Sequence, residues 1–516
     1  MRFFLFLLIL CFLCFPVFSQ EEHNPELESE PGLYSILLVS PGSDSVFIID
    51  SFEFNIKGFT RPDALIRKGE FIKGEEITGL SNFEKYIRDK TQLLFNERVL
   101  ETVSIDYVVG QVQEDGRFPV NLIINTIDTW NIVAIPRPRY SSNSGFDIVL
   151  KARDYNFLGT MSPLRLDIGY IYNEEKQSSL ILELDALIPF RAFGLDWSFK
   201  FDNSFSYRPD TEQPYYYKNT TGLYVDLPVG LTTLTVGFDE SIFVNEENED
   251  IYKHLYGNFQ EGLSMSSSPY ITWRIPAGID IGRWGELVYT PGISAVFTHE
   301  FPQWPLLDES KKGPVIIFRH NLGFKRIDWI ENFRKGLDVY IRNSFDYNFH
   351  DSNLDKNPLT GRLTISGTGH FTLTDYFGIS SRLLYRQWFF HEYGYTKAGD
   401  VMRGILDKDI CTDYMLSLNL DFPVRVLRFS PSEWLNNQKL RIFNFDLHFS
   451  PFVDAALYHE FVKNIEFDIL VTGGAEVIIF PAFFRSLYLC VSIGWDLLDF
   501  SNGRKNEIFI GTDFHY

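Results

Sequence analysis

The chain of 516 residues has a formal net charge of −21 and contains 49 Phe, 26 Tyr and 9 Trp. This charge argues against a nucleic-acid partner, because contact with phosphates requires a basic surface. Hydrophobic residues make up 45% and aromatic residues 16% of the sequence, which suits β structure and membrane interfaces better than an ordinary helical enzyme.

The N-terminus, MRFFLFLLILCFLCFPVFS, combines one basic residue, a long apolar run and small residues near its end. We interpret residues 1–19 as a secretory signal peptide. A lipoprotein signal through Cys11 or Cys14 fits less well, because leucine precedes each cysteine where a small residue is expected. Residues 20–44 are acidic and turn-rich, and we interpret them as a flexible lead-in.

After the signal peptide only Cys411 and Cys490 remain, which is too few for a disulfide framework. No later segment approaches the ~18 uninterrupted apolar residues of a membrane-spanning helix. Two interpretations of this exported, acidic, aromatic-rich chain therefore stay open. It is either a soluble periplasmic β protein or a transmembrane β-barrel.

Residues 45–128 predict a small α+β domain. VFIIDSFEFNIKG is typical of a strand, TRPDALIRKGEF of a short helix, and NFEKYIRDKTQLLF of an amphipathic helix. VLETVSIDYVVG and RFPVNLIINTID predict two strands around the turn QEDGR. The predicted order is β-α-α-β-β, and VSIDYVV is a candidate exposed edge strand.

Residues 129–516 alternate apolar and polar side chains over long segments such as LDWSFKFDNSFSY and GLDVYIRNSFDYNFH. Short connections with Pro or Gly alternate with longer polar ones, as in outer-membrane barrels. We count 16 to 18 strands and predict an all-β transmembrane barrel of about 16 antiparallel strands. Its first strand, WNIVAIPRPRY, contains Pro136 and Pro138, which remove hydrogen-bond donors and favour an edge or a seam.

The sequence contains no HExxH, no G-x-S-x-G, no Walker A motif and, after the signal peptide, no CxxC. His370 and His459 are isolated, as expected for lumen or loop histidines rather than metal ligands. We therefore predict no catalytic residues, no metal and no cofactor. A barrel hydrolase with a Ser/His/acid cluster at its rim is a less favoured alternative.

The order of the segments resembles the outer-membrane assembly barrels, the family of BamA, TamA and the two-partner-secretion transporters. The β-α-α-β-β unit resembles a polypeptide-transport-associated (POTRA) domain, and ARDYNFLGT resembles the start of the family's barrel. VMRGI, with Met402, Arg403, Gly404 and Ile405, is similar to the loop-six motif, although the family usually has an aromatic residue in place of Ile405. SLNLDFP and SPFVDAALYH are similar to the two strands that follow.

The resemblance implies that loop six folds into the barrel and places Arg403 against acidic residues of the inner wall. A confined arginine needs a carboxylate partner to offset its desolvation. Alternation places Asp446 and Asp454 on one inward face and Asp421 and Asn419 on the preceding strand, and these four residues are the expected lumen partners of Arg403. We hypothesise that Arg403 pairs with Asp454 or Asp421; the alternative is a solvated loop arginine.

The chain end, EIFIGTDFHY, resembles the family's closing strand. Ile510, Gly511, Phe514 and Tyr516 would then carry a recognition signal and complete a seam with the first strand. The resemblance implies a non-enzymatic factor that inserts proteins into the bacterial outer membrane or moves polypeptides across it. Its implied partners are the lipid bilayer, unfolded or secreted clients and accessory periplasmic proteins. A passive porin or channel is the main alternative.

Overall fold

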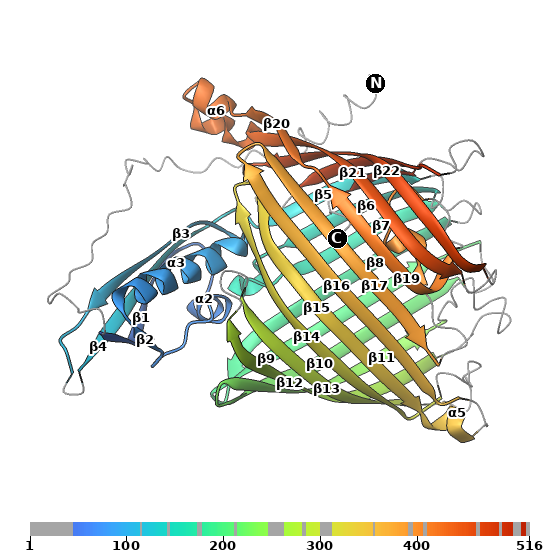
Figure 1. Cartoon of the computed structure of the whole chain (residues 1–516), viewed down its shortest axis with the longest axis horizontal. Coiled ribbons are helices and arrows are strands. Elements are labelled where there is room, and N and C mark those ends of the chain that lie inside the picture. Colours follow the sequence, from blue (N-terminus) through green and yellow to red (C-terminus); the bar gives the residue numbers. More distant parts are fainter. Residues whose placement is uncertain are drawn as a thin grey trace. The chain divides into compact units, whose positions relative to one another are not determined.

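The computed structural model describes residues 45–113, 116–141, 145–172, 178–210, 214–245, 263–280, 285–299, 312–353, 357–390, 396–405, 410–460, 465–483, 488–498 and 507–511 (Figure 1). The signal peptide and lead-in predicted for residues 1–44 lie outside this part of the chain. The chain divides into two compact units. Met1–Pro136 and Leu150–Met161 form the first unit, and Arg137–Val149 and Ser162–Tyr516 form the second.

The first unit contains a four-stranded sheet with two helices. Its strands are β1 (Val46–Lys57), β2 (Glu76–Thr78), β3 (Leu100–Val109) and β4 (Arg117–Asp128), and its helices are α2 (Pro62–Lys68) and α3 (Leu80–Asn96). The sheet order is β2-β1-β4-β3, with β1 parallel to β4, so β3 lies at an edge. The α+β domain is confirmed, with the three-residue strand β2 as an addition to the predicted order.

The core of this unit lies between the sheet and the helices. Along β4 every second side chain is buried, among them Val120, Leu122 and Ile124. From α3, Phe83 stacks on Phe47 of β1 with 4.7 Å between ring centroids. The buried side chains that alternate along the strand and the regularly spaced apolar side chains of the helix thus pack in one core.

The segment NFLGT packs within this first unit. The Asn156 side chain donates to Thr60 Oγ1 at 2.7 Å and to Asp128 Oδ2 at 3.2 Å, and its own oxygen accepts from the Met161 N–H at 2.9 Å. Gly159 has φ +73°, and a Cβ there would lie 2.1 Å from the Phe59 carbonyl oxygen. Glycine is therefore required at this close approach.

The remaining strands form a closed antiparallel barrel. They are β5 (Ile132–Ser141), β6 (Gly145–Asp154), β7 (Leu164–Tyr172), β8 (Ser178–Ala192), β9 (Leu195–Tyr207), β10 (Tyr215–Val229), β11 (Thr232–Val244), β12 (Leu263–Asp280), β13 (Glu286–His299), β14 (Val315–Ile330), β15 (Phe333–Asn348), β16 (Leu359–Thr374), β17 (Phe377–Phe389), β18 (Thr396–Lys397), β19 (Cys411–Asp421), β20 (Val424–Phe429), β21 (Phe445–Glu460), β22 (Ile465–Pro481), β23 (Leu489–Asp496) and β24 (Glu507–Gly511).

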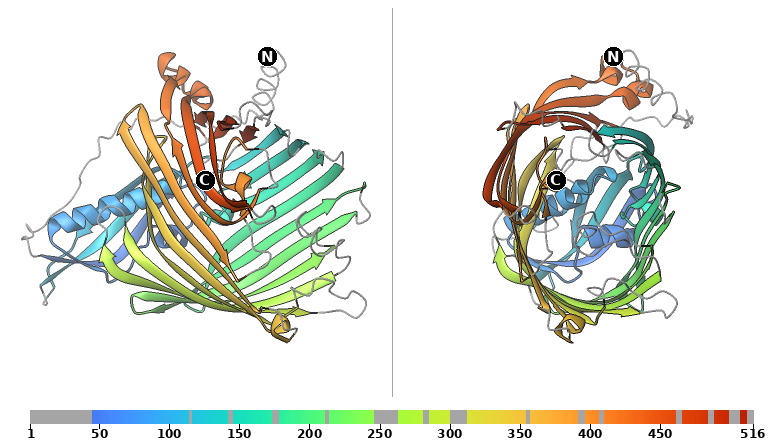
Figure 2. Two further views of the ribbon diagram at one scale, coloured as in Figure 1. Left: turned by 45° about the vertical axis from the view of Figure 1, so that its right-hand side comes forward. Right: turned by 90° about the vertical axis from the view of Figure 1, so that its right-hand side faces the viewer.

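In the described part of the chain this sheet has about 18 strands, the upper end of the predicted range. β19 and β20 both pair with β17 and β21, so they are two parts of one interrupted strand. β18 pairs with β19 inside a loop. β24 neighbours β5, which closes the sheet (Figure 2).

The barrel wall is apolar outside and polar inside. On β21, Phe449 and Val453 are 41% and 42% exposed, whereas the alternating His448 and Asp454 are 1% and 0% exposed. Outward apolar side chains recur on other strands, for example Ile341 of β15. Because a soluble protein would place its apolar face inside, this closed sheet is a transmembrane barrel rather than a periplasmic sandwich.

The helices among the described residues are all too short or too polar to cross a membrane.

Candidate functional site

The loop between β17 and β19 folds against the inner wall of the barrel. After β18 it forms a short 3-10 turn, η4 (Ala398–Asp400), and continues to Ile405. Its apolar residues are buried with inward side chains of the strands in one cluster: Ala398, Val401, Met402, Ile405, Ile410, Leu384, Met415, Ala456, Tyr458 and Leu470. This packing holds the loop in place before any charge is considered.

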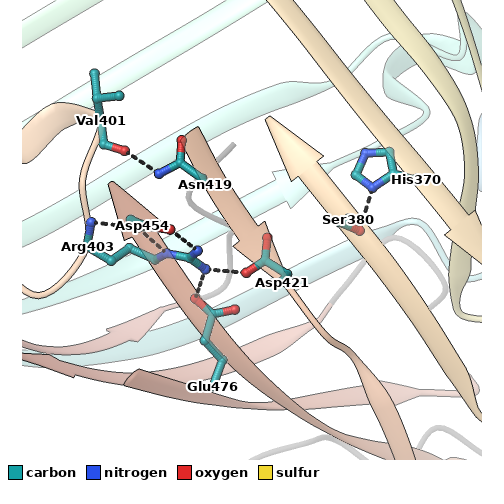
Figure 3. Close-up of polar contacts among 8 residues, drawn as sticks. All are labelled: His370, Ser380, Val401, Arg403, Asn419, Asp421, Asp454 and Glu476. Atoms are coloured by element: carbon teal, nitrogen blue, oxygen red, sulfur yellow. Dashed lines mark hydrogen bonds and ion pairs between the residues drawn. The ribbon is translucent and has the colours of Figure 1, made fainter. Parts of the chain in front are cut away.

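Arg403 is the centre of the site and is 2% exposed (Figure 3). Its Nε and Nη2 donate to the two carboxylate oxygens of Asp454 at 3.0 and 2.6 Å, and its backbone N–H donates to Asp454 Oδ2 at 3.1 Å. Its Nη1 donates to Asp421 and, at 3.1 Å, to Glu476 Oε1. The guanidinium carbon lies 3.8 Å from the Phe452 ring centroid, a cation–π contact.

Three different strands supply these carboxylates. Asp421 ends β19, Asp454 lies in β21 and Glu476 lies in β22. Their inward direction follows from alternation, because neighbours such as Val453 and Val477 are exposed on the outer face. The single positive charge of the guanidinium is shared among three carboxylates. Each of them is buried and relies on Arg403 to offset its desolvation.

Gly404 allows the loop to touch the last strands. It has φ +75°, and a Cβ there would lie 2.8 Å from the Trp495 nitrogen and 2.9 Å from the Gly494 carbonyl carbon. Its N–H donates to Glu507 Oε2 of β24 at 2.6 Å. The loop thus contacts β19, β21, β22, β23 and β24 in sequence order.

The other predicted lumen residues have different partners. Asn419 is buried and donates to the Val401 carbonyl oxygen at 3.1 Å, so it holds the loop backbone rather than the guanidinium. Asp446, which we expected near Arg403, instead accepts from Arg428 Nε at 3.1 Å. Eight residues separate Asp446 from Asp454 on β21, roughly 27 Å along a strand, and alternation gives the face but not the depth.

The predicted closing-strand residues are described only in part. Ile510 and Gly511 lie in β24, where they pair with Val491 and Cys490 of β23. Phe514 and Tyr516 lie outside the described residues.

Sequence reasoning missed Glu476 and the role of Glu507. Glu476 is the single charged residue in the apolar run GGAEVIIF, and a carboxylate within a membrane strand is a signal of a functional or paired site that could have been used. In the structure, Gly474 of the same strand leaves room for the ring that stacks on Arg403, because a Cβ there would lie 2.6 Å from Phe452 Cζ.

A second ionic cluster joins the β14–β15 turn to β20. Glu331 accepts from Arg425 and, at 2.6 Å, from Arg428 Nη2, and Arg428 also contacts Asp446. Burial alone would raise the pKa of Glu331, but the hydrogen bonds from Arg428 and Arg425 outweigh it and lower the pKa below 4.5, its ordinary value.

A cavity adjoins the Arg403 cluster on the inner wall. Its lining includes Phe333, His370, His448 and Phe480 together with Glu476. His370 Nδ1 lies 2.7 Å from Ser380 Oγ (Figure 3). Within the described ranges, no three His, Cys, Asp or Glu side chains are grouped so that they could hold a metal ion.

No protein-family model and no curated protein sequence matches the chain. Among solved structures, it is similar to CdiB from Escherichia coli, with 11% identity and a TM-score of 0.50 over 90% of this chain and 74% of that one. It is also similar to CdiB from Acinetobacter baumannii (12%, 0.45, 91% and 74%) and to BamA from Haemophilus ducreyi lacking POTRA domains 1–3 (14%, 0.38, 90% and 83%). The similarity to CdiB from Escherichia coli shows that the chain shares the fold of that barrel.

Proposed function

We propose that this protein inserts proteins into the bacterial outer membrane or moves polypeptides across it. Its barrel would lie in the outer membrane and its α+β domain, acting as a single POTRA domain, in the periplasm. The work would consist of strand pairing and transfer through the barrel or its seam, without covalent chemistry or a cofactor.

The observation that carries the proposal is the loop held by Arg403. A passive pore needs only a wall, whereas this loop places a buried arginine against three strands and the Gly404 N–H against Glu507 of the closing strand. These contacts link the loop to the strands from β19 to β24, and β24 is the strand that meets β5 where the barrel closes. Strands that are fixed in this way would keep the barrel intact while the seam between β24 and β5 opens and closes again.

The edge strand β3 offers a second element of the mechanism. β3 pairs with β4 on one side and ends the sheet on the other. An unfolded client segment could add to this edge by β-augmentation, with its backbone groups pairing those of residues 100–109. A role as a simple spacer domain is the alternative for this unit.

Depletion of the protein tests the function directly. The abundance of all other outer-membrane and secreted proteins is measured by quantitative mass spectrometry before and after depletion, and after complementation with the unaltered chain or with Arg403→Ala. We expect a defined group of clients to fall, and only the unaltered chain to restore them fully. Unchanged abundances together with a stable conductance in planar bilayers would instead identify a passive channel.

A further inference from the structure

The connection between β20 and β21 forms an ordered arm at one end of the barrel. Residues 430–444 contain a short helix, α6 (Pro431–Trp434), and a 3-10 segment, η5 (Gln438–Phe443), and α6 projects beyond the ends of the neighbouring strands (Figures 1 and 2). Asn444 Nδ2 donates to Ser432 Oγ at 2.6 Å, and both residues are buried. Several other hairpins of the barrel turn within two residues, as at Phe193–Gly194 between β8 and β9.

This arm exposes large apolar side chains although it has a fixed backbone. Trp434 and Leu435 are 61% and 68% exposed, and Ile442 and Phe443 are 47% and 41% exposed. Four such residues lie among 15 positions, and their exposure to water costs about 25 cal/mol per Å² of apolar area. Something apolar is expected to cover them.

The apolar surface of the arm is continuous with the outer face of the barrel. The Trp434 ring lies edge-on to Phe429 at 5.1 Å between centroids, and Phe429 stacks on Phe445 at 5.1 Å. Phe445 begins the outward apolar row of β21, which continues through Phe449 to Val453. The row that faces lipid therefore extends without interruption onto the arm.

We propose that residues 430–444 lie in the lipid interface and anchor this end of the barrel to the adjacent leaflet. Trp and Leu beside Lys439 and Arg441 are the combination that settles at the boundary between acyl chains and headgroups. With Glu433 as the one acidic residue, the arm carries a net charge of +1 in a chain of −21. Anionic lipid headgroups complement this charge, and the continuous aromatic row favours lipid over a protein partner.

Spin-label accessibility tests this placement, which rests on the membrane location of the barrel. Leu435→Cys, Val453→Cys and Lys73→Cys are each labelled with a nitroxide in the chain from residue 20 onwards, with Cys411 and Cys490 replaced by serine. The labelled proteins are reconstituted in vesicles of phosphatidylethanolamine and phosphatidylglycerol. Collision rates with oxygen, which concentrates in lipid, and with a water-soluble nickel chelate are then compared. Val453 reports the lipid-facing wall, and Lys73, with 70% of its side chain exposed, reports water.

We expect position 435 to resemble position 453, with a several-fold higher ratio of oxygen to nickel collisions than position 73. A label at 435 that is as accessible to nickel as position 73 would overturn the inference while position 453 still confirms the barrel in lipid. Protection of 435 from both reagents would also overturn it, because a protein partner or a second copy then covers the arm. Nickel access at 453 would contradict the membrane barrel itself.

Discussion

The guanidinium of Arg403 and the carboxylate of Asp454 form two parallel hydrogen bonds, and the backbone N–H of Arg403 donates to the same carboxylate. The arginine arrives from a loop and the aspartate from β21, 51 residues later in the chain. This bidentate pair therefore fixes both the position and the direction of the loop.

Replacing Arg403 should lower the free energy of unfolding of the barrel while the fold is kept. Arg403→Ala leaves three buried carboxylates without their cation, a loss of about 3–5 kcal/mol. Arg403→Lys keeps the charge but cannot form the fork, so we expect an intermediate loss. Unfolding in urea of protein reconstituted in vesicles gives the free energies. Equal stability of the three proteins would contradict a structural role for the pair.

The acidic partners should differ in importance. Asp454 receives three of the hydrogen bonds of Arg403, whereas Glu476 receives one. Three carboxylates around one cation also repel one another. Neutralising one of them therefore removes some repulsion, which offsets part of the lost hydrogen bonding to Arg403. We expect Asp454→Asn to lower the free energy of unfolding clearly more than Glu476→Gln does. The reverse order would show that the fork is not the main contact.

Gly404→Ala should detach the loop from the last strands. The added Cβ would have to occupy a positive φ and approach the backbone of Gly494 within 3 Å. Gly399→Ala in the same loop is the matched control, because a Cβ there meets no atom within 4 Å. Protease cleavage of the loop should increase only for Gly404→Ala. Similar cleavage of both variants would argue against the close approach.

The Glu331 cluster should weaken in acid. Because the pKa of Glu331 is lowered in the folded protein, its contribution to stability is present above its ordinary value of about 4.5 and is lost as the pH falls through the lower folded value. Glu331→Gln should remove this part of the acid sensitivity. Stability is compared by urea unfolding between pH 7 and the acid limit. A variant with an unchanged pH profile would exclude Glu331 as the titrating group.

Covalent closure of the seam should block transport if the barrel opens between β5 and β24. A cysteine at Ala134 is combined in turn with cysteines at 508, 509 and 510, so that no register has to be assumed. Pairs that form a disulfide should lose client assembly and regain it on reduction. Pairs that cross-link and retain full activity would exclude lateral opening at this seam.

Much of the fold follows from alternation in the sequence. In long runs such as GLDVYIRNSFDYNFH, apolar side chains lie on one face and polar side chains on the other. Strands of this length and pattern form a membrane barrel with the apolar face outwards and the polar face inwards. The short strand β2 could not be predicted, because three residues carry no period and pair only through the neighbouring β1.

The sequence by itself determined the class of the fold and the inward face of Asp454 and Asp421, because a period of two is local to each strand. The resemblance of VMRGI to the loop-six motif indicated the loop that carries Arg403. Only the tertiary structure decided which inward carboxylates meet. It brings Glu476 and Glu507 to the loop and places Asp446 with Arg428 instead. The position of each carboxylate along the barrel depends on strand register and on the place where the loop folds inwards. Both are set by pairing between distant segments, and no single segment contains that information.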